Sequence, residues 1–298
     1  MTASGTLVVV SGAAGAIGGA VAEGLQVAGY RVRGVDLREG RRGVDEMFVG
    51  DCRDEDFALQ VVDGAAALIH LAAQPSPDPL RPERTFLNNV PVSFALCHAA
   101  ASSGVRRIIV ASSISIYGMA YAPRDELVVP YAPVDELTPL QAADTYALGK
   151  AVDELALRMF ERRFGTSSIA LRMPFVSTGA PLNQLGRDTA LDPSLRSREL
   201  WSYLDTRDAV HAFVRALESH VVGTRAFNVV SPASLGSVDV EHLLRSYLPS
   251  VEIRGSIFPG HSAYSTSLAK QLLSFTANWC WCGAMLQDHM ESGHQSHS

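Results

Sequence analysis

Short apolar runs alternate with stretches of helical spacing along the first half of the chain. A β-branched run covers residues 7–10, just before Gly12, and a stretch with helical spacing follows at 16–28. Residues 30–35 and 169–172 also read as strands, and further short apolar runs lie at 47–49, 67–71 and 107–111. Further helix-like stretches lie around 55–62, 90–103 and 143–164. This order predicts an α/β fold, with a doubly wound parallel sheet that is covered by helices on both faces.

Two proline-rich stretches interrupt the alternation, and each follows an expected strand. Four prolines lie within residues 75–82 and four more within 117–142. Because open α/β sheets bind ligands at the carboxyl ends of their strands, we expect these stretches to border a binding site. Beyond Pro174, glycine, proline, serine and asparagine are frequent up to Ser197, and we then expect a helix at 206–219 and a strand at 226–230.

Composition narrows the class of protein. The chain has 298 residues, 47% of them hydrophobic, which is enough for one large domain or two closely packed ones. The net charge of −6 argues against a nucleic-acid partner. Four cysteines are too few for a disulfide scaffold, and no run reads as a membrane span. We therefore expect a cytoplasmic protein with reduced cysteines and no membrane contact.

Three glycines separate the first expected strand from the first expected helix. Gly12, Gly15 and Gly18 would let the backbone turn sharply and approach a pyrophosphate, and the helix N-terminus would add free N–H groups. Asp36 ends the next strand, where it could bond both ribose hydroxyls of NAD and repel the 2′-phosphate of NADP. Arg38 could instead receive that phosphate. The pattern predicts a dinucleotide site and favours NAD over NADP.

A second set of residues could move a proton. Tyr146 and Lys150 stand four residues apart in the expected helix at 143–164, so both side chains lie on one face. A phenol normally titrates at about pH 10, and a nearby ammonium stabilises its phenolate. Ser113 follows the run at 107–111 and could hydrogen-bond a substrate oxygen. Together these features favour acid/base chemistry at a hydroxyl or carbonyl carbon.

In this order, the motifs resemble those of the extended short-chain dehydrogenase/reductases, the NAD-dependent epimerase/dehydratase family. The matching positions are Gly12, Gly15, Gly18, Asp36, Asp51, His70 to Ala73, Asn89, Ser112, Ser113, Tyr117, Gly118, Tyr146, Lys150, Leu171, Arg172, Pro174 and the segment from Tyr203 to Asp208. The resemblance implies a Rossmann-type NAD-binding domain at 1–174, to which 206–231 would return. A smaller, discontinuous substrate lobe would comprise 175–205 and 232–298.

The resemblance also implies roles for single residues. Ser113 would hold the reacting oxygen, Tyr146 would transfer the proton, and Lys150 would bind the nicotinamide ribose and tune Tyr146. Asp51 would bond the adenine amine. The residues implied to contact NAD are Gly12, Gly15, Ala16, Ile17, Gly18, Asp36, Asp51, Cys52, Leu71, Ala72, Ala73, Asn89, Tyr146, Lys150 and Pro174.

Structural roles and a partner follow from the same resemblance. His70 would be structural beside the cofactor, and Tyr117 would be a wall of the site rather than a second base. A homodimer would form through the helix that carries Tyr146 and the helix at 90–103. Its apolar contacts would come from residues that could equally belong to the core, namely Leu155, Met159 and Phe160.

Departures from the family pattern narrow the reaction. The resemblance implies Thr-Asp-Glu at positions 113–115 for a sugar-nucleotide 4,6-dehydratase, whereas this chain has Ser113, Ile114 and Ser115. Ile114 and Ser115 cannot perform the acid and base steps of dehydration. Phe175 replaces an asparagine that often contacts the diphosphate of nucleotide sugars. We expect hydride transfer at a secondary alcohol carbon of a nucleotide sugar or uronate, by epimerisation or net oxidation. The alternatives are an NAD(P)H-dependent reductase of a non-sugar ketone and a dinucleotide-binding regulator without turnover.

The last stretch of the chain, from about Thr276, also departs from the pattern. Cys280 and Cys282 precede three histidines, but Cys-x-Cys is not a standard zinc spacing. We expect no metal site and an altered or frayed terminus, which includes His289, His294 and His297. A substrate anion clamp could come from one of several arginines that could equally be solvated, namely Arg187, Arg196, Arg198, Arg207 and Arg254.

Overall fold

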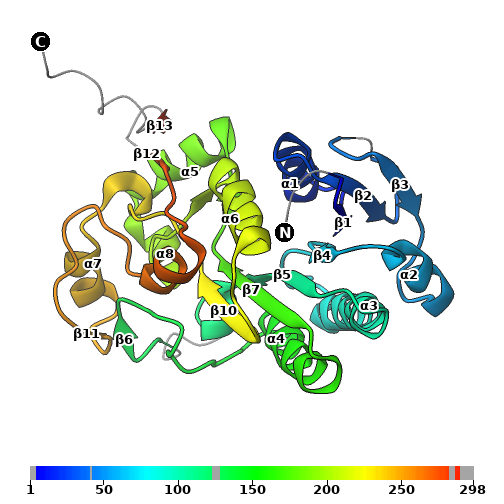
Figure 1. The fold of residues 1–298 in the computed structure, drawn as a ribbon. Helices are drawn as coiled ribbons and strands as arrows, with labels where there is room; N and C mark the ends of the chain where they lie inside the picture. Colours follow the sequence, from blue (N-terminus) through cyan, green and yellow to red (C-terminus); the bar gives the residue numbers. More distant parts are fainter. Residues whose placement is uncertain (1–4, 41, 123–127, 282–285, 289–298) are drawn as a thin grey trace, which may run out of the picture.

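The computed structural model describes residues 5–40, 42–122, 128–281 and 286–288. A parallel sheet of seven strands runs through it (Figure 1). The strands are β1 (Leu7–Ser11), β2 (Arg31–Asp36), β3 (Glu46–Val49), β4 (Ala67–His70), β5 (Arg107–Ser113), β7 (Ser167–Met173) and β10 (Thr224–Asn228). Their spatial order is β10-β7-β5-β4-β1-β2-β3, with every neighbouring pair parallel. The predicted doubly wound sheet is confirmed. The order in which the chain adds strands reverses between β1 and β4, and such sheets bind ligands at this point.

Helices cover both faces of this sheet, because successive side chains of a strand point to opposite faces. Val8 and Val10 of β1 pack with α1 (Ala16–Val27) and α6 (Thr206–Glu218). Val9 packs on the other face with α2 (Glu55–Val62), α3 (Pro82–Ser102) and α4 (Thr145–Phe164). The last two helices lie side by side (Figure 1). In the described part of the chain, no helix is long and apolar enough to cross a membrane.

Some of the shorter elements, among them η1 (Ile114–Tyr117), β6 (Tyr131–Ala132) and α7 (Val240–Tyr247), build a further core that includes the fully buried Trp201. After residue 223 the chain comes back to the main sheet, where β10 pairs with β7. The other shorter elements are β8 (Val176–Ser177), α5 (Gly179–Leu191), η2 (Pro193–Glu199), β9 (Leu204–Asp205), η3 (Leu235–Ser237), β11 (Glu252–Ile253), α8 (Ser267–Leu273), β12 (Trp279–Trp281) and β13 (Leu286–Asp288).

The structure extends one expected helix and adds another. α3 begins at Pro82 rather than at residue 90, because a proline in the first turn removes an N–H that has no helical partner there. α5 occupies a stretch rich in glycine, proline, serine and asparagine, for which the sequence analysis gave no helix. Its Leu182 packs with Trp281, and a Cβ on its Gly186 would overlap the indole of that tryptophan. Packing against a distant residue therefore favours this helix over its own composition.

Of the altered or frayed end expected from about Thr276, the part up to Trp281 is ordered and not frayed. Phe275, Ala277 and Trp281 are buried. The backbone nitrogens of Asn278 and Trp279 donate to the Asp208 carboxylate of α6, at 2.8 and 3.0 Å. These contacts hold the segment on the rest of the protein.

Candidate active site

The loop between β1 and α1 makes the close approaches that its glycines predict. Gly12 has a φ of 73°, and a Cβ there would lie 2.8 Å from the backbone nitrogen of Ala72. A Cβ on Gly18 would overlap the carbonyl oxygen of Gly12. Gly15 precedes α1 without a side-chain cap, so the N–H groups of the first turn can serve a phosphate. The loop therefore fits a pyrophosphate against bare backbone.

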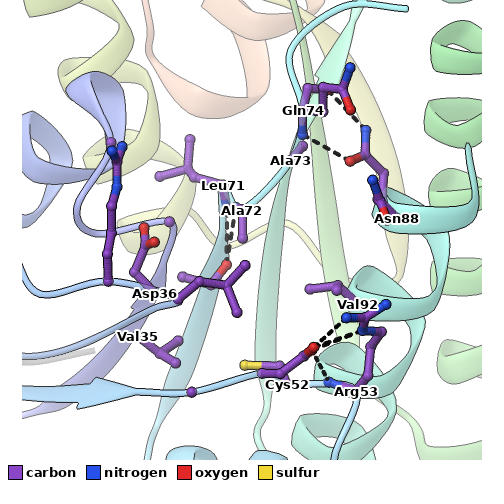
Figure 2. Close-up of a pocket in the computed structure, with 18 residues that line it drawn as sticks. Val35, Asp36, Cys52, Arg53, Leu71, Ala72, Ala73, Gln74, Asn88 and Val92 are labelled. Carbon is purple, nitrogen blue, oxygen red and sulfur yellow. Dashed lines mark hydrogen bonds and ion pairs between the residues drawn. The ribbon is translucent and has the colours of Figure 1, made fainter. Parts of the chain in front are cut away.

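A cavity of about 450 Å³ opens beside this loop, at the carboxyl ends of β1, β2 and β4. Asp36 lies on its wall (Figure 2), and its Oδ2 accepts a hydrogen bond of 3.1 Å from the backbone nitrogen of Ala14. This bond fixes the carboxylate next to the phosphate loop. Arg38 lines the same cavity. The volume, the acid and the bare loop fit the adenosine half of a dinucleotide.

The end of β4 forms the neighbouring wall. The Ser11 hydroxyl oxygen accepts hydrogen bonds from the backbone nitrogens of Leu71, at 3.1 Å, and Ala72, at 3.3 Å (Figure 2). It also lies 2.8 Å from Nδ1 of His70, within hydrogen-bond distance. Burial lowers the pKa of His70 to about 3, and the Lys150 ammonium adds to the lowering. The imidazole is therefore neutral, which fits the structural role expected of it.

Two polar residues implied to contact the cofactor are already engaged by the protein. The Asp51 carboxylate accepts hydrogen bonds from Nε of Arg53, at 3.0 and 2.9 Å, and this guanidinium lowers the pKa of Asp51 (Figure 2). Asn89 accepts a bond of 2.8 Å from the Gln74 backbone nitrogen and returns one of 2.9 Å to its carbonyl. Both residues line the cavity, and Asn89 also fixes the loop after β4.

The cavity unites part of the predicted cofactor set. Among the predicted residues, its lining includes Gly12, Gly15, Asp36, Asp51, Cys52, Leu71, Ala72, Ala73 and Asn89. Ala16, Ile17 and Gly18 lie in the first turn of α1, and Tyr146, Lys150 and Pro174 lie outside the lining. The lining residues that sequence reasoning missed belong to no motif and flank the predicted ones, namely Ser11, Val35, Leu37, Gly50, Arg53, Gln74, Asn88 and Val92.

Tyr146 and Lys150 lie on one face of α4, as their spacing predicts. Nζ of Lys150 is 5.8 Å from the centre of the Tyr146 ring. Lys150 is buried, whereas Tyr146 is half-buried. The helix starts just before Tyr146, because the Asp144 carboxylate accepts a hydrogen bond of 2.8 Å from the Ala147 nitrogen. The arrangement places a cation close enough to stabilise a phenolate.

Ser113 ends β5, and a buried hydrogen bond holds α4 against this end. Oγ of Ser112 donates to Oε1 of Glu154 at 2.7 Å, one turn beyond Lys150. Oγ of Ser113 accepts hydrogen bonds from the backbone nitrogen and the hydroxyl of Ser115, at 3.1 and 3.0 Å. The Ser113 hydroxyl thus keeps its own proton to donate. The three residues predicted to carry the chemistry lie on two elements that pack together.

Two further tyrosines correct the sequence-based description of this centre. Tyr117 is 1% exposed, and its hydroxyl accepts from Arg172 at 2.9 Å and donates to Asn228 Oδ1 at 2.7 Å. Burial raises its pKa to about 12. Tyr117 is therefore part of the core, and its expected place as a wall of the site is wrong. Tyr121, which no motif indicated, packs edge-on against Tyr146 with ring centres 6.2 Å apart.

A partly buried ion pair lies near Tyr121 and Tyr146. Arg196 lies 3.3 Å from Glu199, and its guanidinium stands 5.7 Å from the centre of the Phe175 ring. Burial raises the pKa of Glu199, against the opposing effect of Arg196. The pKa of Tyr121 is raised by burial, then by Tyr146 and by Glu199, which places the pair near the proton-transfer centre. Among the candidate arginines, Arg196 is thus brought to this side of the site, and Arg198 also acts on Glu199.

The described residues hold no cluster of metal-ligating side chains. Sγ of Cys280 lies 3.9 Å from the hydroxyl oxygen of Ser231. The other metal candidates lie outside the described residues, namely Cys282, His289, His294 and His297.

Known proteins resemble the chain over most of its length. The model of the NAD dependent epimerase/dehydratase family matches residues 8–230. The UDP-glucose 4-epimerase of Streptomyces lividans is 32% identical over 157 residues, which cover 49% of this chain and 45% of that protein. The L-arabinose 1-dehydrogenase (NAD(P)(+)) of Haloferax volcanii is 26% identical over 229 residues, which cover 75% and 87%. The match thus spans less than half the length of the UDP-glucose 4-epimerase and most of the length of the L-arabinose 1-dehydrogenase.

A solved structure agrees over nearly the whole chain. A short-chain dehydrogenase/reductase superfamily protein from Agrobacterium tumefaciens with bound NAD superposes with a TM-score of 0.69 and 25% identity. The superposition covers 92% of this chain and 93% of that one.

Proposed function

Since the chain belongs to the NAD-dependent epimerase/dehydratase family, we propose that it transfers a hydride at a secondary alcohol carbon of a sugar. The observation that carries this proposal is the Tyr146–Lys150 pair on α4, packed against the end of β5 that bears Ser113. The names of two relatives, which refer to UDP-glucose and L-arabinose, support a sugar as the substrate.

NAD is the cofactor of this family, and the cavity fits its adenosine half. Gly12 and Gly18 let the loop pack tightly where any Cβ would collide with backbone, and the uncapped first turn of α1 leaves its N–H groups for the pyrophosphate. Asp36 is placed to accept hydrogen bonds from the ribose hydroxyls and to repel a 2′-phosphate. When bound, NAD supplies the group that takes the hydride and returns it.

The protein's own residues would handle the proton. Ser113 donates a hydrogen bond to the substrate oxygen and fixes it near Tyr146. Tyr146 takes the hydroxyl proton while the carbon is oxidised, and it gives the proton back when a carbonyl is reduced. The Lys150 ammonium stabilises the phenolate between these steps. A chain that only bound a dinucleotide would not need the Tyr146 hydroxyl.

Epimerisation and net oxidation would share this centre. In epimerisation the transient ketone turns over in the pocket and is reduced on its other face, whereas in oxidation it leaves. Many nucleotide-sugar enzymes have an asparagine at the position of Phe175. Phe175, whose ring packs against the Arg196 guanidinium, offers no amide to a diphosphate. This favours a uronate or a free sugar over a nucleotide sugar, as the L-arabinose relative also does.

The test is incubation of the protein with NAD and a panel of nucleotide sugars, uronates and free sugars. Nicotinamide absorbance would report net oxidation, and proton NMR of the sugar would report epimerisation. We expect turnover by one of these readouts, and loss of it in Tyr146→Phe. Reduction of non-sugar ketones alone would instead support the ketone reductase. NAD binding without any turnover would support the regulator.

A further inference from the structure

Asp153 is a buried acid that the proposed proton transfer does not use. Its Oδ2 lies 3.6 Å from Nζ of Lys150, and the two side chains are each 4% exposed. Tyr146, Lys150 and Asp153 follow one another at a spacing of four and then three, which places them on one face of α4. The Lys150 ammonium therefore has the phenol ring one turn before it and a carboxylate one turn after it.

A carboxylate at this position is costly, because burial disfavours its charge. Burial raises the pKa of Asp153, while the Lys150 ammonium and a hydrogen bond from Ser93 oppose that rise. An apolar side chain would fill the same space between α3 and α4 at no such cost. The adjacent Glu154 has its own partner, Arg172, at 2.8 Å, so Asp153 is not needed for that ion pair.

Other charged and titratable groups face this trio. These groups lie on the elements packed around the trio, namely His70 on β4, Cys97 on α3, Asp144 before α4 and Glu154 on α4. On the side of Tyr146 they are Tyr121, Arg196 and Glu199. Burial keeps His70 and the Cys97 thiol neutral at pH 7. Arg172 and Arg196 balance the two glutamates. Asp153 is thus the carboxylate that directly opposes the Lys150 charge.

We propose that Asp153 is a positioning residue that holds the Lys150 ammonium and limits how strongly this charge stabilises the Tyr146 phenolate. The proposal rests on Tyr146 as the proton carrier of the proposed function. A carboxylate beside the ammonium cancels part of its field at the phenol. Tyr146 then gives a proton about as readily as it takes one, as a reversible oxidation and reduction of the same carbon requires.

The test reads the phenol directly and needs no substrate. Phenolate absorbance near 295 nm is titrated with NAD bound, and the Tyr146→Phe titration is subtracted. We expect Asp153→Asn to lower the midpoint of the difference curve by about one pH unit, the size expected for one charge removed at this range. Glu161→Gln is the matched control, since Glu161 lies on the same helix and bonds the Thr224 nitrogen instead. It should leave the midpoint unchanged.

An unchanged or raised midpoint in a folded Asp153→Asn protein would overturn the proposal. If that variant does not fold by circular dichroism, Asp153→Ser removes the same charge with a smaller polar group and carries the same expectation. The outcome is separable from the proposed function. Full turnover in Tyr146→Phe would refute the proton carrier, whereas an inactive Tyr146→Phe with no midpoint shift in Asp153→Asn would refute the role of Asp153 alone.

Discussion

Buried charges organise the site at the scale of single residues. The side chains of Arg172 and Glu154 are 3% and 5% exposed, and their ion pair joins Tyr117 on one side to Ser112 on the other. The sequence shows Arg172 within a motif and gives no sign of its partner on α4. Local sequence patterns thus indicated Asp36, Tyr146 and Lys150. They did not indicate ion pairs between side chains on different elements, such as Arg172 and Glu154.

Tyr146 should be required for turnover and not for cofactor binding. Tyr146→Phe keeps the ring that packs against Tyr121, so the fold should survive. It removes the hydroxyl, and loss of a general acid/base typically lowers the rate by about 100- to 10,000-fold. Steady-state turnover, measured beside NAD affinity by calorimetry, checks this expectation.

Two companion variants separate the roles at the same centre. Ser113→Ala should lower turnover with NAD affinity intact, because it removes only the donor to the substrate oxygen. Lys150→Met should lower both turnover and NAD affinity, because it removes the ammonium beside the phenol and the expected ribose contact. Wild-type turnover in Tyr146→Phe would contradict the assignment, and Tyr121 would then be the residue to test.

Asp36 should set the choice between NAD and NADP. Asp36→Ala should weaken NAD binding by on the order of 10- to 100-fold, since each hydrogen bond to a charged group contributes about 1.5–3 kcal/mol. NADP binding should weaken less or improve, because the variant removes a repulsive charge while Arg38 remains. Glu39→Ala is the matched control, an exposed acid outside the cavity lining. Equal losses for both cofactors, or a wild-type preference for NADP, would contradict the assignment.

At the scale of elements, the sequence predicted those that carry their own signals. α2 spans Glu55–Val62, as expected, and Gly165, with a φ of 71°, ends α4 where its glycine predicts. The sequence did not predict α5, because that helix depends on Trp281 nearly a hundred residues later. The packed segment up to Trp281 was missed for the same reason, since its partners lie on α5 and α6.

The contact between α6 and the C-terminal segment should make stability depend on pH. Asp208 is fully buried, and burial raises its pKa to about 6, against the effect of its two backbone hydrogen bonds. The native state therefore holds this proton more tightly than the unfolded state, in which Asp titrates near 3.9. The contribution of Asp208 to the free energy of unfolding should be largest below about pH 4 and should fall as pH rises to about 6, by up to about 3 kcal/mol.

Urea unfolding at several pH values between 4 and 7.5 checks this dependence. The free energy of unfolding of Asp208→Asn should decline less over this range than that of the wild type. Asp54→Asn serves as the control for the loss of a carboxylate elsewhere, because Asp54 caps α2 from an exposed position away from the C-terminal segment. Parallel curves for Asp208→Asn and the wild type would show that the buried carboxyl does not titrate in this range.

At the scale of the whole molecule, the alternation of strands and helices was enough to predict the parallel sheet. The chain's handed connections place the ends of β1, β2 and β4 together, so the glycine loop and Asp36 could be assigned to one cavity from sequence alone. The far wall of this cavity could not be assigned from sequence. Arg53 and Gln74 come from loops whose paths depend on packing, and Asn88 lies in the part of α3 that precedes the expected helix. The division into an NAD-binding domain and a substrate lobe stays a proposal, as does the role of each residue in the site.

The outer surface of α3 and α4 leads to a prediction about assembly. Phe160, one of the residues expected at a dimer interface, is fully buried in the core and cannot contribute to one. Leu155 is 62% exposed, and further apolar side chains are exposed on the same two helices, namely Leu87, Phe94 and Leu148. Apolar side chains grouped on two packed helices often mark a protein contact. We therefore propose a homodimer through α3 and α4.

Light scattering at micromolar concentrations should give twice the mass of one chain for the wild type. Leu155→Glu should shift the mass toward that of one chain, because a carboxylate would be desolvated in the centre of the interface. Val27→Glu is the matched control, because Val27 is 91% exposed at the end of α1, which packs on the other face of the sheet. It should leave the dimer intact. A monomeric wild type, or a dimer that tolerates Leu155→Glu, would show that the α3–α4 surface is not a dimer interface.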